Sequence, residues 1–371
     1  MELWDIYDAD KKPTGRTMKR NDWCLKDGEY HLTVLGVVAR PDQTFLITKR
    51  VMTKAWAPGW WEVSGGAAQA GEESYEAVLR EVKEETGYAL TSYRFRGIVT
   101  FVSGNGVTEY MHLFTADEFE GKPIACDEGE LEWVKKEDVL KLNIWEGDRI
   151  FLRLLADEEP FFSLKLVYDG HDTLVSAVLN GKPMELFDIL NPDGSKTGIV
   201  RERVVAHREG SLHATVHMWI VRPNEKSGYD VLLQKRSQTK DSNPGSYDIS
   251  SAGHVDAGDE ILESAIRELK EELDIEAKPE ELHYIGVHYG AFEAEFYGKM
   301  FRDRELSSVY VYTEPVEIEN LKLQKEEVEA VRWMDYEECR QKVHDGTMPN
   351  CIYEDEFRMV GEYLDRVSVG R

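Results

Sequence analysis

Two stretches of the chain carry an arginine and three glutamates at a spacing that suits metal-assisted hydrolysis. The glutamates lie three and four residues apart, so on a helix they share one flank. Like charges so placed oppose helix formation, and a divalent cation is their natural compensation. Carboxylates holding such a cation can neutralise a diphosphate and help to aim water at phosphorus. The residues are Arg80, Glu81, Glu84 and Glu85, and then Arg267, Glu268, Glu271 and Glu272.

The alternative interpretation, a solvated acidic helix face, is disfavoured because a longer pattern is repeated around both sets. The first copy begins at Gly66, continues through Glu72 and ends at Gly87. The second copy begins at Gly253, with Asp259 in place of the first glutamate and Asp274 in place of the last glycine. Average residue usage does not produce so many fixed positions twice by chance. The pattern resembles the Nudix box, G-x5-E-x7-R-E-U-x-E-E-x-G-U with U aliphatic, of the Nudix hydrolases.

This resemblance implies a cofactor and a role for each residue. The arginine would orient the glutamate that follows it, the glutamates would bind Mg²⁺ or Mn²⁺, and Glu81 or its counterpart could also act as the base. A further acid is expected from a later segment of each half. For the first half this is Glu128, and an exposed turn acid without a catalytic role is an equal alternative. For the second half it is Glu327, and the neighbouring Glu326 could equally fill the position. The expected catalytic residues are Arg80, Glu81, Glu128, Arg267, Glu268 and Glu327, and the expected loop and helix supports are Gly66, Glu72, Gly87, Gly253 and Asp259.

Similarity between the two halves extends beyond the boxes and predicts two whole domains. The segment after Glu2 matches the segment after Glu185, and other matches keep a separation near half the chain length. We expect domains at residues 1–180 and 185–371, joined by a linker at 181–184. Alternating strand patterns around one long helix predict an α/β/α sandwich with a mixed sheet in each half, the fold that the resemblance also implies. The first box helix should bury Tyr75, Val78 and Val82.

Candidate substrate contacts lie outside the boxes. Basic pairs at predicted strand ends could meet phosphates, although solvated strand-end charges are equally common. The tail of the first half resembles the oxidised-purine nucleoside triphosphatase branch, which implies that Trp145 and Asp148 line a base pocket; core and capping roles are the alternatives. Glu62 and Gly147 depart from that branch, where an asparagine and an acid are usual. The full set of candidates is Lys49, Arg50, Trp145, Asp148, Lys235 and Arg236.

The second half resembles a hydrolase branch close to isopentenyl-diphosphate isomerase. Ala252 stands where the isomerase has a cysteine, which argues against the paired proton transfers of isomerisation. We therefore expect a hydrolase for another organic diphosphate; a diphosphate-sensing module and, less favoured, an isomerase are the alternatives. His213, His217 and His254 only loosely match metal-ligand spacing, and packing or hydrogen bonding of neutral imidazole is the favoured interpretation.

Charge and composition limit the partners. A net charge of −26 over 371 residues disfavours nucleic-acid polymers and anionic membranes, and favours small phosphorylated substrates bridged by metal. The four cysteines lack zinc-site spacing, and the N-terminus lacks the basic and apolar zones of a signal peptide. These features predict a protein of the reducing cytoplasm. Oligomeric state and communication between the domains stay open.

Overall fold

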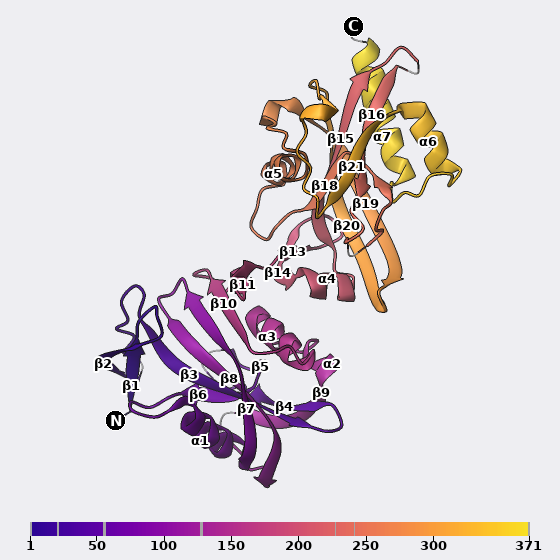
Figure 1. Ribbon diagram of the computed structural model, residues 1–371. Coiled ribbons are helices and arrows are strands. Elements are labelled where there is room, and N and C mark those ends of the chain that lie inside the picture. Colours follow the sequence, from indigo (N-terminus) through magenta and orange to yellow (C-terminus); the bar gives the residue numbers. More distant parts are fainter. Residues whose placement is uncertain are drawn as a thin grey trace. The chain divides into compact units, whose positions relative to one another are not determined.

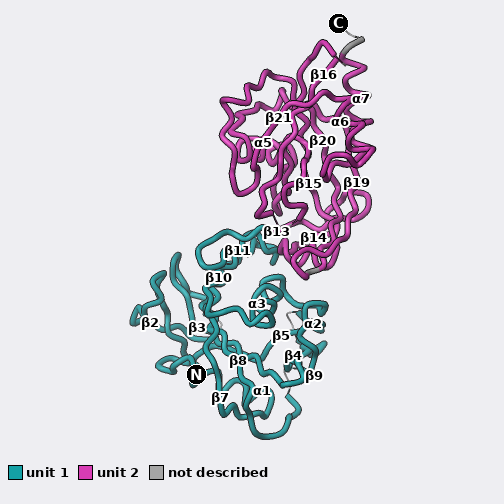
Figure 2. Tube along the Cα trace, turned by 45° about the vertical axis from the view of Figure 1, so that its right-hand side comes forward, with its two compact units in different colours: residues 1–185 teal, residues 186–371 magenta. Residues whose placement is uncertain are grey.

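The computed structural model describes residues 2–20, 22–54, 57–126, 129–226, 228–240 and 242–369. The chain divides into two compact units, Met1–Glu185 and Leu186–Arg371 (Figure 2). Residues 181–184, expected to be a linker, include β12 (Lys182–Pro183), which pairs with β11 of the first unit.

The first unit is built around a mixed sheet. Its strands pair in the order β12-β11-β10-β7-β8-β3-β1-β2, while β4 pairs with β3, β5 and β9. Because β3 runs parallel to β8 and β7 runs parallel to β10, the sheet is not a simple meander. The remaining elements are β1 (Leu3–Tyr7), β2 (Pro13–Lys19), β3 (Tyr30–Arg40), β4 (Thr44–Arg50), β5 (Trp61–Glu62), β6 (Ser64–Ala67), α1 (Ser74–Thr86), β7 (Tyr88–Ser103), β8 (Thr108–Gly121), β9 (Gly129–Lys135), α2 (Lys136–Val139), α3 (Glu146–Ala156), β10 (Phe162–Tyr168) and β11 (Leu174–Leu179).

The second unit repeats this plan. Its strands pair in the order β14-β13-β15-β16-β17, with β18 and β20 also on β15, β19 on β20 and β21 on β16. Again β15 and β20 are parallel, so this sheet is mixed too. Its elements are β13 (Leu186–Leu190), β14 (Lys196–Glu202), α4 (Arg203–Glu209), β15 (His213–Pro223), β16 (Tyr229–Arg236), β17 (Tyr247–Asp248), β18 (Ser251–His254), α5 (Ile261–Leu273), η1 (Pro279–Glu281), β19 (Leu282–Phe296), β20 (Lys299–Tyr312), η2 (Ile318–Asn320), β21 (Val328–Asp335), α6 (Tyr336–His344) and α7 (Glu354–Val369).

Alternation along β15 explains why helices cover both faces of the second sheet. Successive side chains of a strand point to opposite faces, so Val216 and Met218 pack with Leu269 of α5. Trp219 points the other way and packs with Phe357 of α7. Figure 1 shows α5 on one side of this sheet and α6 with α7 on the other. The α/β sandwich predicted for each half is confirmed.

The box helix α1 buries a slightly different stripe from the one expected. Val78 and Val82 are fully buried, as expected, but Ala77 joins them and Tyr75 is 42% exposed. At about 100° per residue, Tyr75 lies within about 20° of the direction of the buried Val82, but it is the second residue of α1 and stands in the first turn, so periodicity gives its direction and not its exposure. The expected burial of Tyr75 is therefore wrong.

Among the described residues, no helix combines the length and the low polarity that crossing a membrane requires.

Candidate functional site

Local signals fix the length of each box helix and hence the positions of its glutamates. In α1 the Glu76 carboxylate accepts a hydrogen bond from the N–H of Glu73 at the N-terminus, 3.2 Å away. Gly87 ends the helix with φ +80°, and its N–H donates to the Lys83 carbonyl. In α5 the corresponding residue, Asp274, adopts the same left-handed conformation with φ +59°. Asp274 also forms ion pairs with Lys270 and Lys322.

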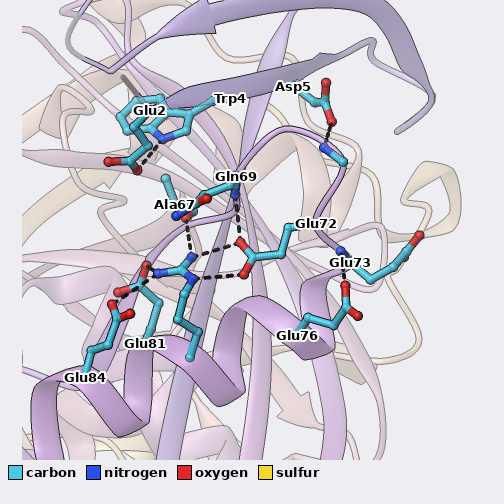
Figure 3. A network of polar contacts seen from close by, with 12 residues as sticks. Glu2, Trp4, Asp5, Ala67, Gln69, Glu72, Glu73, Glu76, Glu81 and Glu84 are labelled. Atoms are coloured by element: carbon cyan, nitrogen blue, oxygen red, sulfur yellow. Dashed lines mark hydrogen bonds and ion pairs between the residues drawn. The ribbon is translucent and has the colours of Figure 1, made fainter.

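Arg80 contacts three carboxylates of the first unit, those of Glu72, Glu81 and Glu84, which are labelled in Figure 3. Its Nε and Nη2 donate to the two oxygens of Glu72, each at 2.9 Å, which ties the loop to the helix. Its Nη1 lies 2.6 Å from Glu81 Oε1 and 3.5 Å from Glu84 Oε2. One guanidinium thus contacts three carboxylates and holds Glu81 beside the loop that ends β6.

The backbone of strand β6 receives two of these glutamates at close range. A Cβ on Gly66 would lie 2.6–2.7 Å from the Glu81 carboxylate, so only glycine fits there without displacing it. The N–H of Gly65 donates to Glu85 Oε2 over 3.2 Å. Burial raises the pKa of Glu81, although Arg80 opposes the shift. The site therefore contains a desolvated carboxylate whose negative charge is only partly compensated.

The second unit keeps this arrangement with one change in the loop. Arg267 Nη1 lies 2.8 Å from Glu268 Oε1 and 3.6 Å from Glu271 Oε2. Asp259 was expected to support the loop from the position of Glu72. Among the described residues, however, the loop acid within ion-pair distance of Arg267 is Asp256, at 3.8 Å. The side chain at 259 is one methylene shorter than the glutamate it replaces, which shortens its reach.

Glu272 is more deeply buried than its counterpart Glu85. Its Oε2 accepts from Ser251 Oγ at 2.6 Å and from the N–H of Ala252 at 3.2 Å. Burial raises the pKa of Glu272 to about 7, despite these hydrogen bonds. A Cβ on Gly253 would lie 2.1–2.4 Å from atoms of Glu268, so the close approach of glycine and glutamate is repeated.

One of the two expected late acids, Glu327, contacts a partly buried lysine. Glu128 lies outside the described residues. Glu327 precedes β21 and contacts the ammonium group of Lys240. Burial lowers the pKa of Lys240, which places this lysine in a partly dry environment beside Glu272.

The basic pairs at the ends of β4 and β16 contact protein groups. The Arg50 guanidinium lies 2.7 Å from Glu62, and Arg236 lies 2.9 Å from Asp248. Strand pairing places the two acids equivalently, because Thr48 pairs with Glu62 and Gln234 pairs with Asp248. The lysines differ: Lys49 lies over the ring of Trp61 at 5.6 Å, while Lys235 binds Glu329 at 2.7 Å. Each unit thus has an arginine–carboxylate pair that sequence patterns did not reveal.

The start of α3 gathers the candidate base-pocket residues. The rings of Trp145 and Trp60 lie 4.7 Å apart at 39°. Asp148 is half-buried, and loss of water together with the nearby Glu62 raises its pKa to about 8. Tyr168 accepts a hydrogen bond from the N–H of Gly147 at 2.7 Å. The arrangement offers two aromatic rings and a carboxyl group that is largely protonated at neutral pH.

Asp148→Asn should change the pH dependence of stability. A folded-state pKa of about 8 against the ordinary 3.8 means that the folded chain holds this proton more tightly than the unfolded chain does. Wild-type stability is therefore lost as pH rises between these values, and asparagine removes that loss. We expect the urea midpoint of the variant to rise relative to that of wild type as the pH increases from about 4 to about 8. Asp27→Asn, at an exposed carboxyl group, should show no such gain; an equal response of both variants contradicts the assignment.

The histidines of the second unit divide into two environments. His217 Nδ1 lies 2.7 Å from the fully buried Glu356, which also accepts from Trp219. Burial lowers the pKa of His217, but the charges of Glu356 and Glu305 outweigh it and raise the pKa to about 9. The expectation of a neutral imidazole is therefore wrong for His217. His213 and His254 instead gather with His207, which sequence spacing did not single out.

Comparisons with known proteins cover both units. A NUDIX domain model matches residues 29–155 and 211–352, more than half of the chain. The chain is 43% identical over 158 residues to Nudix hydrolase 3 of Arabidopsis thaliana, covering 42% of this chain and 20% of that protein. It is 40% identical over 144 residues to an uncharacterized Nudix hydrolase of Clostridium acetobutylicum, covering 39% of this chain and 66% of that protein. It therefore spans less than two thirds of either relative.

Two further matches cover nearly whole proteins. The oxidized purine nucleoside triphosphate hydrolase of Danio rerio is 29% identical over 151 residues, which cover 40% of this chain and 94% of that protein. A solved MutT structure from Bacillus halodurans is 27% identical with a TM-score of 0.37, and the match covers 41% of this chain and 99% of that one.

Proposed function

Because the chain belongs to the Nudix family, we propose that each unit hydrolyses a phosphoanhydride bond in a small phosphorylated substrate, with Mg²⁺ or Mn²⁺ as the cofactor. The observation that carries this proposal is the arginine network, in which Arg80 and Arg267 each contact two successive glutamates of a box helix. Both units keep it, which favours two active sites over one site and a sensing module.

The residues present fit a divalent cation. In the first unit the glutamates of α1 outnumber the single guanidinium that contacts them, and Glu81 is desolvated. Oxygen donors in this number are the ligands that Mg²⁺ prefers. When bound, the cation neutralises phosphate charge and lowers the pKa of water. We assign metal binding to Glu81, Glu84 and Glu85, and to Glu268, Glu271 and Glu272.

The protein's own groups would orient the site and move the proton. Arg80 would hold Glu81 against Gly66 of strand β6, where a carboxylate with raised pKa is suited to accept a proton from attacking water. Arg267 would hold Glu268 in the same way. Glu128 and Glu327 remain the proposed late acids, with Lys240 as the partner of the second. Arg50, Arg236 and Lys235 are proposed phosphate contacts that would exchange protein carboxylates for substrate oxygens. Lys49, which lies over the ring of Trp61, is a fourth proposed phosphate contact.

For the first unit we propose a nucleoside triphosphate, an oxidised purine nucleotide being one candidate. The paired rings of Trp60 and Trp145 beside Asp148 support it, because an aromatic face and a carboxyl group can stack on a base and hydrogen-bond its edge. For the second unit we propose a different organic diphosphate. We further propose that the protein acts in the cytoplasm, where its four free thiols would stay reduced.

A substrate panel on the full chain tests the proposal. Nucleoside triphosphates, nucleotide sugars, dinucleoside polyphosphates, coenzyme A and prenyl diphosphates would be incubated with and without Mg²⁺, and products identified. We expect Mg²⁺-dependent cleavage of a phosphoanhydride bond in at least two classes. Absence of turnover across the panel with either cation counts against the proposal.

Trp145→Ala should selectively weaken the binding of purine nucleotides to the first unit. Stacking of a base on an aromatic ring contributes about 1–3 kcal/mol, so KM should rise roughly 5- to 150-fold. Hydrolysis of an unrelated diphosphate by the same preparation should be unchanged. Tyr93→Ala, which removes a ring that contacts Phe114 instead, is the matched control. Equal loss for both substrates, or a large fall in Tm, would assign Trp145 to the core.

A further inference from the structure

A repeated pattern outside the boxes is not used by the proposed hydrolysis. Residues 2–6 read Glu-Leu-Trp-Asp-Ile and residues 185–189 read Glu-Leu-Phe-Asp-Ile, and a Thr-Gly pair follows each segment. The segments contribute the first strand of the hairpins β1–β2 and β13–β14. Their aromatic residues are buried, whereas the next residues, Asp5 and Asp188, point to the other face and are half-buried. Packing accounts for the aromatic residues and leaves the two acids unexplained.

Each aspartate holds the loop that precedes its box helix. Asp5 Oδ2 accepts a hydrogen bond from the N–H of Gly71 at 2.7 Å (Figure 3). Asp188 Oδ2 accepts one from the N–H of Gly258 at 3.0 Å. The N–H of the residue before each glycine donates over 2.7 Å to a carbonyl of the same hairpin, from Ala70 to Leu3 and from Ala257 to Leu186. Two successive N–H groups of each loop are therefore tied to the hairpin.

The backbone conformation of the loops explains why these residue types meet. Gly71 has φ +80° and Gly258 has φ +90°, a region in which a side chain is strained. A carboxylate accepts a stronger hydrogen bond from a backbone N–H than a neutral oxygen does. An aspartate at this position of the hairpin therefore stabilises a turn that has an unusual backbone conformation.

In the first unit the tied glycine lies next to the polar network of the box. Gly71 precedes Glu72, whose carboxylate binds Arg80 through two hydrogen bonds of 2.9 Å. Arg80 in turn lies 2.6 Å from Glu81. The loop is thus held from two directions, by Arg80 of the helix and by Asp5 of the hairpin. Because Glu72 and Glu81 share one guanidinium, a shift of the loop would be passed to a proposed metal ligand.

The second unit has the weaker connection on the helix side. Among the described residues, the loop acid within ion-pair distance of Arg267 is Asp256, and their separation of 3.8 Å is too long for a hydrogen bond. The hairpin side is reinforced, because Asp188 also forms an ion pair with Lys196 at 2.8 Å. The loop of the second unit therefore depends more on its hairpin aspartate than the loop of the first unit does.

We propose that Asp5 and Asp188 are positioning residues of the two active sites, which hold the box loops so that Arg80 and Arg267 keep their glutamates in place for the cation. This proposal rests on the proposed hydrolysis. It makes the N-terminal hairpin of each unit a part of that unit's active site, and removal of one aspartate should impair one reaction only.

Alanine and asparagine variants of the full chain test the proposal. Asp5→Ala should lower kcat for the first unit's substrate by about 10- to 100-fold with KM little changed, the usual loss when an outer partner of a metal ligand is removed. Asp5→Asn keeps an oxygen acceptor of the same shape and should retain most of the activity. Asp188→Ala should have the larger effect, on the second unit's substrate, and turnover by the other unit should be unchanged in each variant. Asp10→Ala, which removes an exposed acid from the turn of the first hairpin, is the matched control.

Hydrogen exchange supplies a readout that does not depend on hydrolysis. In the metal-free protein, residues 68–73 should exchange faster in Asp5→Ala and residues 255–260 faster in Asp188→Ala, while the box helices stay protected. The proposal fails if either turnover or loop protection of the alanine variants stays at the wild-type level, or if Asp5→Asn loses as much activity as Asp5→Ala. It also fails if the box helix loses protection together with the loop, because the hairpin then serves packing. Absence of hydrolysis by the wild-type chain would count against the proposed function instead, since exchange is measured without substrate or metal.

Discussion

Glu85→Gln is expected to lower turnover of the first unit's substrate by roughly 10²-fold or more, while turnover of the second unit's substrate persists. The substitution removes one negative charge from the proposed cation site at nearly constant shape. The amide oxygen can still accept the hydrogen bond from the N–H of Gly65, so the loop should keep its position. Glu272→Gln should produce the reciprocal result.

The pair of variants also tests whether each unit hydrolyses its own substrate. Initial rates on each substrate, measured across Mg²⁺ concentrations, would show whether the loss lies in metal affinity or in turnover at saturating metal. Glu263→Gln removes one exposed carboxylate from the first turn of α5 and should leave both activities intact. Near-normal activity of the double variant Glu85→Gln/Glu272→Gln would contradict the metal assignment. If Glu272→Gln alone changes no hydrolysis, the second unit is better described as a sensing module.

The fold could be predicted because its signals are local and repeated. Alternation predicted the β15 strand, the spacing of Val78 and Val82 predicted the buried face of α1, and the boxes predicted both long helices. Tyr75 was misplaced because periodicity gives the direction of a side chain and not how far the helix end is covered: Tyr75 points nearly the same way as the buried Val82, but it lies in the first turn of α1.

The polar contacts between segments were much less predictable. Arg50 and Glu62 are adjacent only because β4 pairs with β5, and Asp303 meets His207 only because β20 and α4 converge on β15. No spacing within one segment reveals such pairs. Gly147 is a further example of a tertiary contact that the sequence does not reveal. The sequence shows a glycine where an acid was expected, and the structure gives the reason, because a Cβ at this position would lie 2.6 Å from the Tyr168 hydroxyl.

His217 shows how a burial argument can give the wrong charge. Its sequence context is an apolar strand, which favours a neutral imidazole. Its partner Glu356 lies 139 residues away on α7, and a fully buried carboxylate at 2.7 Å reverses the preference. Only the tertiary fold supplies that carboxylate.

Gly66→Ala is expected to reduce turnover in the first unit by about 10²-fold with little loss of stability. The added methyl group would lie 2.6–2.7 Å from the Glu81 carboxylate, which must move by several tenths of an ångström or more. The atoms displaced are the mobile end of a side chain, so the backbone of α1 can stay in place. Activity is less tolerant, because a displacement of about 1 Å in a reacting group can cost on the order of 10²-fold.

Gly170→Ala is the matched control, because a methyl group there meets only Asn105 at an ordinary 3.7 Å. Steady-state kinetics and thermal unfolding of both variants would separate the two effects. The second unit offers a repeat of the test, since a methyl group on Gly253 would meet Glu268 even more closely, at 2.1–2.4 Å. If Gly66→Ala keeps full activity with an unchanged Tm, then the position of Glu81 against the β6 loop does not matter for turnover, and another carboxylate must accept the proton. If activity and Tm instead fall together, the glycine serves packing, and the kinetic loss says nothing about Glu81.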